Sequence, residues 1–184
     1  MIQKDHYLKV AKNYGHYASW AVWANEGEKP KSNIGDIRIF DLEYNPNILQ
    51  ILNPDVVMVG LNISWRIEKT FGNFHDSKPQ AQDYKIRYAF KNTKYYGAYM
   101  TDIIKDFEQV ISGTVASYLN NNRGFEEQNI ELFKQELQDL KVTNPLLIAF
   151  GNHSYNILNR HFTDKYQIIK IPHYSNYISK ERYK

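Results

Sequence analysis

The fold class is decided by one stretch, Val56-Val57-Met58-Val59-Gly60-Leu61-Asn62-Ile63-Ser64. Its first four residues are apolar and mostly β-branched, which is typical of a short strand buried on both faces of a sheet. The stretch becomes polar after Gly60, so we expect a loop directly after that strand. The apolar run 168–171 is followed in the same way by Pro172 and His173-Tyr174-Ser175-Asn176-Tyr177. Parallel strands end at one edge of a sheet, where α/β proteins bind ligands, so the two polar loops are expected to face one pocket.

Composition indicates one globular domain that covers residues 1–184. Of the 184 residues, 42% are hydrophobic, which is enough for a single core. The absence of cysteine excludes disulfides, thiolate catalysis and cysteine-ligated metals. A net charge of +3 is compatible with nucleic-acid binding but does not require it. The 15 tyrosines can fill a core or stack on bases.

No motif indicates a membrane span, a cofactor or a metal. No apolar run approaches the roughly 18 residues that a span needs. The N-terminal residues also lack the charged-then-apolar layout of a signal peptide, so we expect a cytoplasmic protein. There is no glycine-rich phosphate loop and no dinucleotide fingerprint, so no cofactor is expected. His75, His153 and His161 do not have the spacing of a metal-ligand set.

Hydrophobic periodicity predicts strands and helices that alternate along the chain. Helices are predicted at 7–23, 45–52, 84–90, 129–142 and 153–159. Strands are predicted at 56–59, 98–104, 146–150 and 166–171, and the polar segment 105–124 is expected to be a mobile connection. Such alternation implies right-handed crossovers. The expected fold is therefore α/β, a three-layer α/β/α sandwich with a four-stranded, mainly parallel sheet.

The order of these elements, together with the two loops, resembles the uracil-DNA glycosylase superfamily. In that superfamily the first strand ends in Gly-x-(Asn, Asp or Glu)-Pro and the last ends in His-Pro-Ser or a relative. Gly60-Leu61-Asn62 is similar to the first motif as mismatch-specific members have it, and His173 with Ser175 is similar to the second. The stretch Tyr99-Met100-Thr101-Asp102-Ile103-Ile104-Lys105 resembles the family's second strand, which often carries Thr-Asn followed by apolar residues and a lysine. The resemblance covers residues 53–184 and implies a uracil-DNA glycosylase-like fold in a monomer that acts on a flipped base in DNA.

The resemblance implies roles for eight residues. Asn62 would position the attacking water and His173 would stabilise the departing base, which makes them the catalytic pair. Phe74 would stack on the base, with Asp102 and Leu61 as further base-binding residues. Three residues would contact DNA: Ser64 and Ser175 at phosphates, and Tyr177 as a wedge in the duplex.

The chain departs from the family pattern at three positions. Ile63 and Tyr174 replace the prolines of the two motifs. Asp102 stands where many members have the asparagine that reads uracil, although mismatch-specific members also lack that asparagine. An amide offers uracil a donor and an acceptor, whereas an ionised carboxylate only accepts. We therefore expect hydrolysis of the N-glycosidic bond of a damaged or mismatched base, uracil or a related one.

Each of these residues also has a structural interpretation. Asn62 could cap a helix after the strand, and His173 could hydrogen-bond a neighbouring loop. Phe74 could belong to the core, and Tyr177 could be a surface ring. Asp102 could form an ion pair with Lys105 or Arg87.

Two other function classes remain open. A non-catalytic module with this fold could bind DNA, a nucleotide or a protein, and the lost prolines and Asp102 favour it. A small-molecule hydrolase could use Ser64 beside His173, although no Gly-x-Ser-x-Gly elbow is present. DNA binding without base release would identify the first class, and ester turnover without DNA affinity would identify the second.

Overall fold

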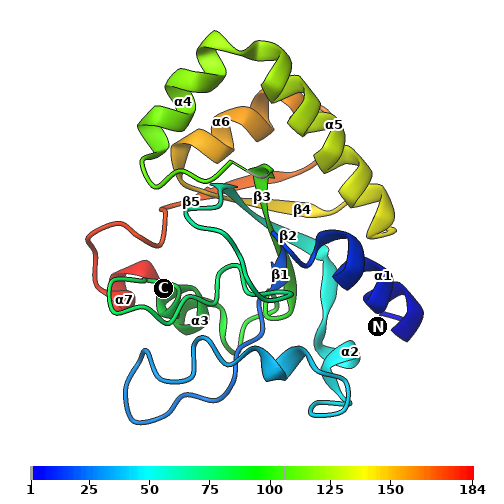
Figure 1. Cartoon of the computed structure of the whole chain (residues 1–184), viewed down its shortest axis with the longest axis vertical. Helices are drawn as coiled ribbons and strands as arrows, with labels where there is room; N and C mark the ends of the chain where they lie inside the picture. The colour runs from blue at the N-terminus through cyan, green and yellow to red at the C-terminus, as the bar shows by residue number, and fades with distance from the viewer. Residues whose placement is uncertain (1, 106) are drawn as a thin grey trace.

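The fold is built on a five-stranded mixed sheet (Figure 1). The computed structural model describes residues 2–105 and 107–184. Its elements are, in chain order, α1 (Lys4–Tyr14), β1 (Ser19–Trp20), η1 (Ile37–Phe40), α2 (Ile48–Ile51), β2 (Asn53–Asn62), α3 (Tyr84–Phe90), β3 (Ala98–Ile104), α4 (Ser112–Asn121), α5 (Arg123–Asp139), β4 (Leu146–Phe150), α6 (Gly151–Phe162), β5 (Ile168–Ile171) and α7 (Lys180–Tyr183).

The strands lie in the order β1-β3-β2-β4-β5. β2 is central and pairs in parallel with β3 and β4, and β4 pairs in parallel with β5. β1 is an antiparallel edge strand on β3. The register of β2 and β3 sets Gly60 opposite Asp102 and Asn62 opposite Ile104. The carboxyl ends of these two strands therefore meet at one edge, where the first polar loop was expected.

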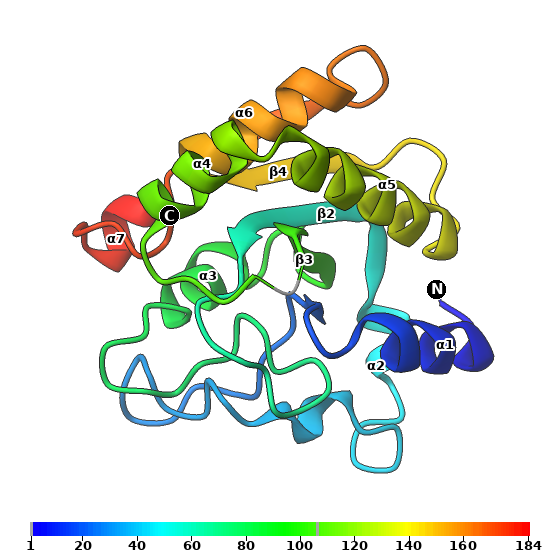
Figure 2. The ribbon, with the colours of Figure 1, turned by 45° about the horizontal axis from the view of Figure 1, so that its top comes forward.

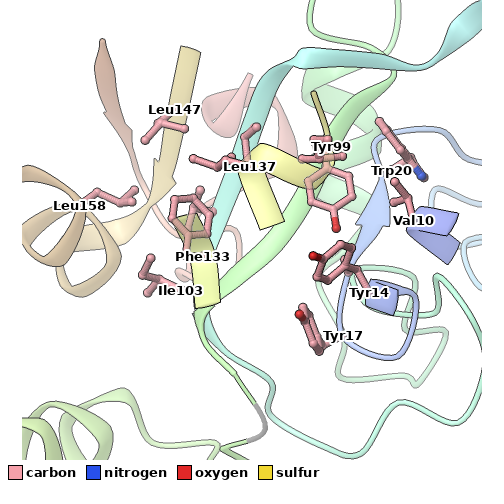
Figure 3. Packing of buried hydrophobic residues seen from close by; sticks show 14 of the residues in the cluster. Val10, Tyr14, Tyr17, Trp20, Tyr99, Ile103, Phe133, Leu137, Leu147 and Leu158 are labelled. Carbon is pink, nitrogen blue, oxygen red and sulfur yellow. The ribbon is translucent and has the colours of Figure 1, made fainter. Parts of the chain in front are cut away.

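Alternate side chains of the sheet belong to two separate cores, because successive residues of a strand point to opposite faces. Val57 and Val59 of β2 belong to the larger core, which includes residues of α1, α5 and α6. Figure 3 shows this core, with Phe133 and Leu137 of α5 beside the strands. Val56 and Met58 belong to the second core with residues of α3. In Figure 2, α4, α5 and α6 lie on one side of the sheet and α3 on the other, so the predicted α/β class is confirmed.

The predicted helix 7–23 is wrong in its second half, where the structure has an edge strand. α1 ends at Tyr14, and Ser19 and Trp20 pair with Met100 and Tyr99 of β3. The sheet therefore has five strands and not the expected four. Residues 17–23 are all buried, and a run that is buried throughout carries no periodicity. The apparent helical spacing therefore joined residues of two different elements.

The bounds of α2, β2, α5, α6 and β5 also differ from those predicted, and two differences concern the surroundings of the site. The segment 105–124, predicted as a mobile connection, contains α4 and the start of α5. β2 continues to Asn62, which makes Gly60 and Leu61 strand residues and not loop residues. Both differences arise because tertiary packing overrides weak local signals, as when Val115 and Leu119 of α4 are buried in the larger core.

Candidate functional site

A cavity of about 940 Å³ lies at the carboxyl ends of the parallel strands. Seven of the eight predicted site residues line it: Leu61, Asn62, Ser64, Phe74, Asp102, His173 and Ser175. Tyr177 does not line it, and its side chain is fully exposed beside a neighbouring shallow groove. The two polar segments after β2 and β5 therefore border one cavity, as expected of segments that follow parallel strands.

Asn62, the last residue of β2, has its side-chain amide fixed by backbone carbonyl groups. Its Nδ2 lies within hydrogen-bonding distance of the carbonyl oxygens of Ile63 (2.8 Å), Phe107 (2.9 Å) and Gln109 (2.7 Å), which share its two hydrogens. These bonds orient the amide and leave Oδ1 without a partner among residues 2–105 and 107–184. The next described helix after β2 is α3, which begins at Tyr84, so the helix-cap interpretation is wrong. A fixed amide oxygen can accept a hydrogen bond from a water but cannot take its proton.

The His173 ring is held by the residue two positions later. The Ser175 backbone N–H donates to Nδ1 at 3.2 Å, and the Ser175 hydroxyl lies 2.7 Å from the same nitrogen. Because a backbone N–H only donates, Nδ1 is the acceptor and the neutral ring carries its proton on Nε2. Burial lowers the pKa of His173 to about 4, which keeps the ring neutral at physiological pH. The site therefore offers a neutral imidazole N–H donor. The Ser175 hydroxyl donates its hydrogen to this ring.

Aromatic rings form one wall of the cavity. The Phe74 centroid lies 6.0 Å from that of Phe150 and 6.2 Å from that of Tyr174. The Tyr174 ring also stacks on His173, with centroids 4.4 Å apart. Tyr174, which replaces a family proline, thus joins the aromatic wall to the imidazole. Phe74 is 4% exposed, so it is a core residue and a cavity residue at the same time.

The backbone at Phe74 is in a sparsely populated conformation. Its φ is 61°, which is unusual for a bulky residue. The Phe74 N–H donates to Oδ1 of Asn73 at 3.0 Å, and Trp23 Nε1 donates to the Phe74 carbonyl at 3.3 Å. These bonds hold the strained residue in place beside the cavity.

Asp102 is buried against Gly60 and bonded to Asn73. Nδ2 of Asn73 donates to Asp102 Oδ2 at 2.8 Å and to the carbonyl of Tyr17 at 2.7 Å. A Cβ atom added at Gly60 would lie 2.1 Å from Asp102 Oδ1, so the carboxyl occupies the space that glycine leaves. Burial raises the pKa of Asp102 to about 7, although the Asn73 hydrogen bond opposes this rise. The expected alternatives do not hold, because Lys105 pairs with Glu136 and Arg87 lies nearest Glu26.

Two polar cavity residues were missed by sequence reasoning. Asn73 positions both Asp102 and Phe74. Asp83 is buried in the wall, accepts the Asp76 N–H at 2.7 Å and has its pKa raised to about 7 by burial. Both belong to the long segment between β2 and α3, where no periodicity distinguishes a buried polar residue from a solvated one. The only sequence signal was the position of Asn73 directly before Phe74.

The rim of the cavity combines an exposed aromatic ring with charged residues. Trp65 is 54% exposed, and Lys78 Nζ lies 5.0 Å from the centroid of its ring. The lining also contains the cations Arg66, Lys69 and Lys170 and the acids Glu68 and Asp76. Stacking groups interleaved with cations are typical of surfaces that bind nucleic-acid strands.

Comparison of the chain with protein-family models, curated proteins and solved structures finds no match. Residues 2–105 and 107–184 contain no group of three or more histidine and acidic side chains that could hold a metal ion. Among the helices described in those ranges, none is long and apolar enough to cross a membrane.

Proposed function

We propose that this protein is a DNA glycosylase that hydrolyses the N-glycosidic bond of a damaged or mismatched base, uracil or a related one. The observation that carries the proposal is the pairing in one cavity of a fixed amide oxygen on Asn62 with a neutral donor on His173. The proposal includes a uracil-DNA glycosylase-like fold, with DNA as partner and a cytoplasmic monomer that needs no cofactor.

The chemistry requires a placed water, a stabilised leaving group and an extruded nucleotide. The departing base takes the bonding electrons and becomes an anion, while the sugar becomes a cation that water attacks. Asn62 Oδ1 orients that water, and the proton is lost after attack because an amide is not a base at this pH. His173 Nε2–H donates to the anionic base oxygen. Such a site suits a dissociative transition state, because a general base is not required before the bond breaks.

The aromatic wall and the rim support the binding half of the proposal. A base extruded from DNA needs an aromatic surface to replace its lost stacking, and Phe74 lines the cavity with Tyr174 edge-on to it at 66°. Lys78, Lys170 and Trp65 at the rim are suited to phosphates and to neighbouring bases. The residues at the two family proline positions are both packed in the structure. Ile63 is buried in the larger core, and Tyr174 belongs to the aromatic wall.

The test is base release from single- and double-stranded oligonucleotides that carry uracil, hypoxanthine, xanthine, mismatched or alkylated bases. We expect release of one of these bases, with a loss of about 100-fold or more in Asn62→Ala and in His173→Ala. Asn156→Ala, an exposed asparagine of α6, is the matched control and should keep the full rate. Unchanged rates in both site variants would refute the assignment.

A non-catalytic binding module is the second candidate, and the buried carboxyl of Asp102 favours it. An ionised carboxylate cannot donate to a base carbonyl. Oligonucleotide binding that survives both site substitutions, with no base released at high protein concentration, would establish this candidate in place of the glycosylase.

A further inference from the structure

Asp102 and Phe74 are neighbours in the cavity lining. The point at which a Gly60 Cβ would stand is 2.1 Å from Asp102 Oδ1 and 3.4 Å from Phe74 Cζ. The carboxyl and the tip of the aromatic ring are therefore neighbours, and both line the cavity. The carboxyl is therefore close enough to the ring to contact the edge of a base stacked there.

The two oxygens of Asp102 are not equivalent. Oδ2 accepts a hydrogen bond from Asn73 Nδ2 at 2.8 Å. The other hydrogen of Nδ2 is bonded to the Tyr17 carbonyl, which fixes the orientation of the amide and keeps Nδ2 as the donor to Asp102. If the carboxyl is protonated, the proton therefore belongs on Oδ1. In that form the group offers one donor and one acceptor, which is the pattern of an asparagine side chain. In the ionised form it offers acceptors only.

Several charged groups surround Asp102 and act on its charge. Lys105 favours the ionised form, while Glu136 opposes it. Lys105 is itself bonded to Glu136 at 2.5 Å, so much of its charge is neutralised. Asp83 and Tyr174 also face this carboxyl across the cavity, and a negative charge on Asp102 raises the pKa of both. With burial as the largest cause, the pKa of Asp102 is about 7, which leaves a large protonated fraction near neutrality.

We propose that Asp102 reads the target base as a carboxylic acid, in which Oδ1–H donates to a base carbonyl and Oδ2 accepts the adjacent base N–H. The ligand class is a base edge with a carbonyl beside an N–H, as uracil presents. Deprotonation places a negative charge against the base carbonyl, so base release is lost as the solution becomes alkaline. This inference rests on the proposed glycosylase function and names how its pocket selects a base.

The experiment is single-turnover release of uracil from an oligonucleotide between about pH 5.5 and about pH 9, for wild type, Asp102→Asn and Asp83→Asn. For wild type we expect a rate that falls about tenfold per pH unit above about pH 7, the slope of one deprotonation. Asp102→Asn has a permanent donor and acceptor, and its Oδ1 can still accept the Asn73 hydrogen bond. Its rate should therefore equal the acidic wild-type rate and stay constant across the range.

Asp83→Asn is the matched control, because Asp83 is another buried cavity carboxyl whose pKa is raised to about 7. This variant should keep the alkaline fall, whereas Asp102→Asn should abolish it. Identical pH profiles in wild type and Asp102→Asn would overturn the inference and leave the proposed function intact. An inactive but folded Asp102→Asn beside an active wild type would also overturn it. No release by any of the three proteins would overturn the proposed function, and the inference with it.

Discussion

Replacement of Gly60 by alanine tests the packing that joins the sheet to the site. The added Cβ would stand 2.1 Å from Asp102 Oδ1, a separation that real Cβ atoms do not show. Gly60 and Asp102 are opposite each other in paired strands, so the backbone cannot separate without breaking the β2–β3 pairing. The carboxyl must move by about 1 Å, which breaks its hydrogen bond to Asn73.

The expected cost follows from these two effects. Overpacking of a closed site costs about 1–3 kcal/mol. The loss of a hydrogen bond to a buried carboxyl costs about 1.5–3 kcal/mol. We expect Gly60→Ala to lower the free energy of unfolding by about 3 kcal/mol and the melting temperature by about 6–12 °C for a chain of this length. Urea titration and calorimetry measure these quantities, and base release should fall together with them.

Gly124→Ala in α5 is the control, because nothing lies within 4 Å of its added Cβ. This change should leave stability unchanged or raise it slightly, since alanine favours a helix more than glycine does. Adding Asp102→Ala to Gly60→Ala should recover part of the lost stability, because it removes the clashing carboxyl. An unchanged melting temperature in Gly60→Ala, or no coupling in the double variant, would refute the packing argument.

Three further substitutions test the charges and hydrogen bonds around the site. Lys105→Met should cost about 3–5 kcal/mol of unfolding free energy, because it leaves the buried Glu136 carboxylate without its cation; a loss below about 1 kcal/mol in urea titration would contradict this. Ser175→Ala should reduce base release about 2–10-fold with unchanged DNA affinity, because one hydrogen bond that orients His173 is removed and the backbone N–H remains; an unchanged rate would show that the hydroxyl does not position the ring. When the pH rises from about 4 to about 7, the free energy of unfolding should fall more in wild type than in Asp83→Asn. In this range the Asp83 carboxyl is ionised in the unfolded chain but protonated in the folded chain, where its pKa is raised to about 7, so rising pH favours unfolding. Equal pH dependence of unfolding in both proteins would contradict the raised pKa.

The strands were predictable because each is a short apolar run between polar or breaking residues. Residues 98–104 and 146–150 were predicted with the observed bounds, and α3 also begins and ends as predicted. β1 was not predictable, because two strand residues inside a longer buried run have no local signature. They form a strand only because β3 offers an unpaired edge.

The candidate site divides in the same way. The motif residues could be named because Asn62 ends one mainly apolar run and His173 comes two residues after another. Asn73 could not be found in this way, since its importance comes from contacts with Asp102 and Tyr17, which are far from it in sequence. Tyr177 is fully exposed and lies outside the cavity lining, and its role as a wedge in the duplex stays a prediction.

The sequence by itself determined the α/β class and the polar character of two strand ends, because both are properties of neighbouring residues. The tertiary structure alone decided the raised pKa of Asp102 and the lowered pKa of His173, because burial is the largest cause of both. A side chain's protonation depends on its burial and on the groups that surround it. For Asp102 these groups are Lys105 directly after β3, Glu136 of α5 and Asn73 of the segment before α3, and only folding brings them to one point.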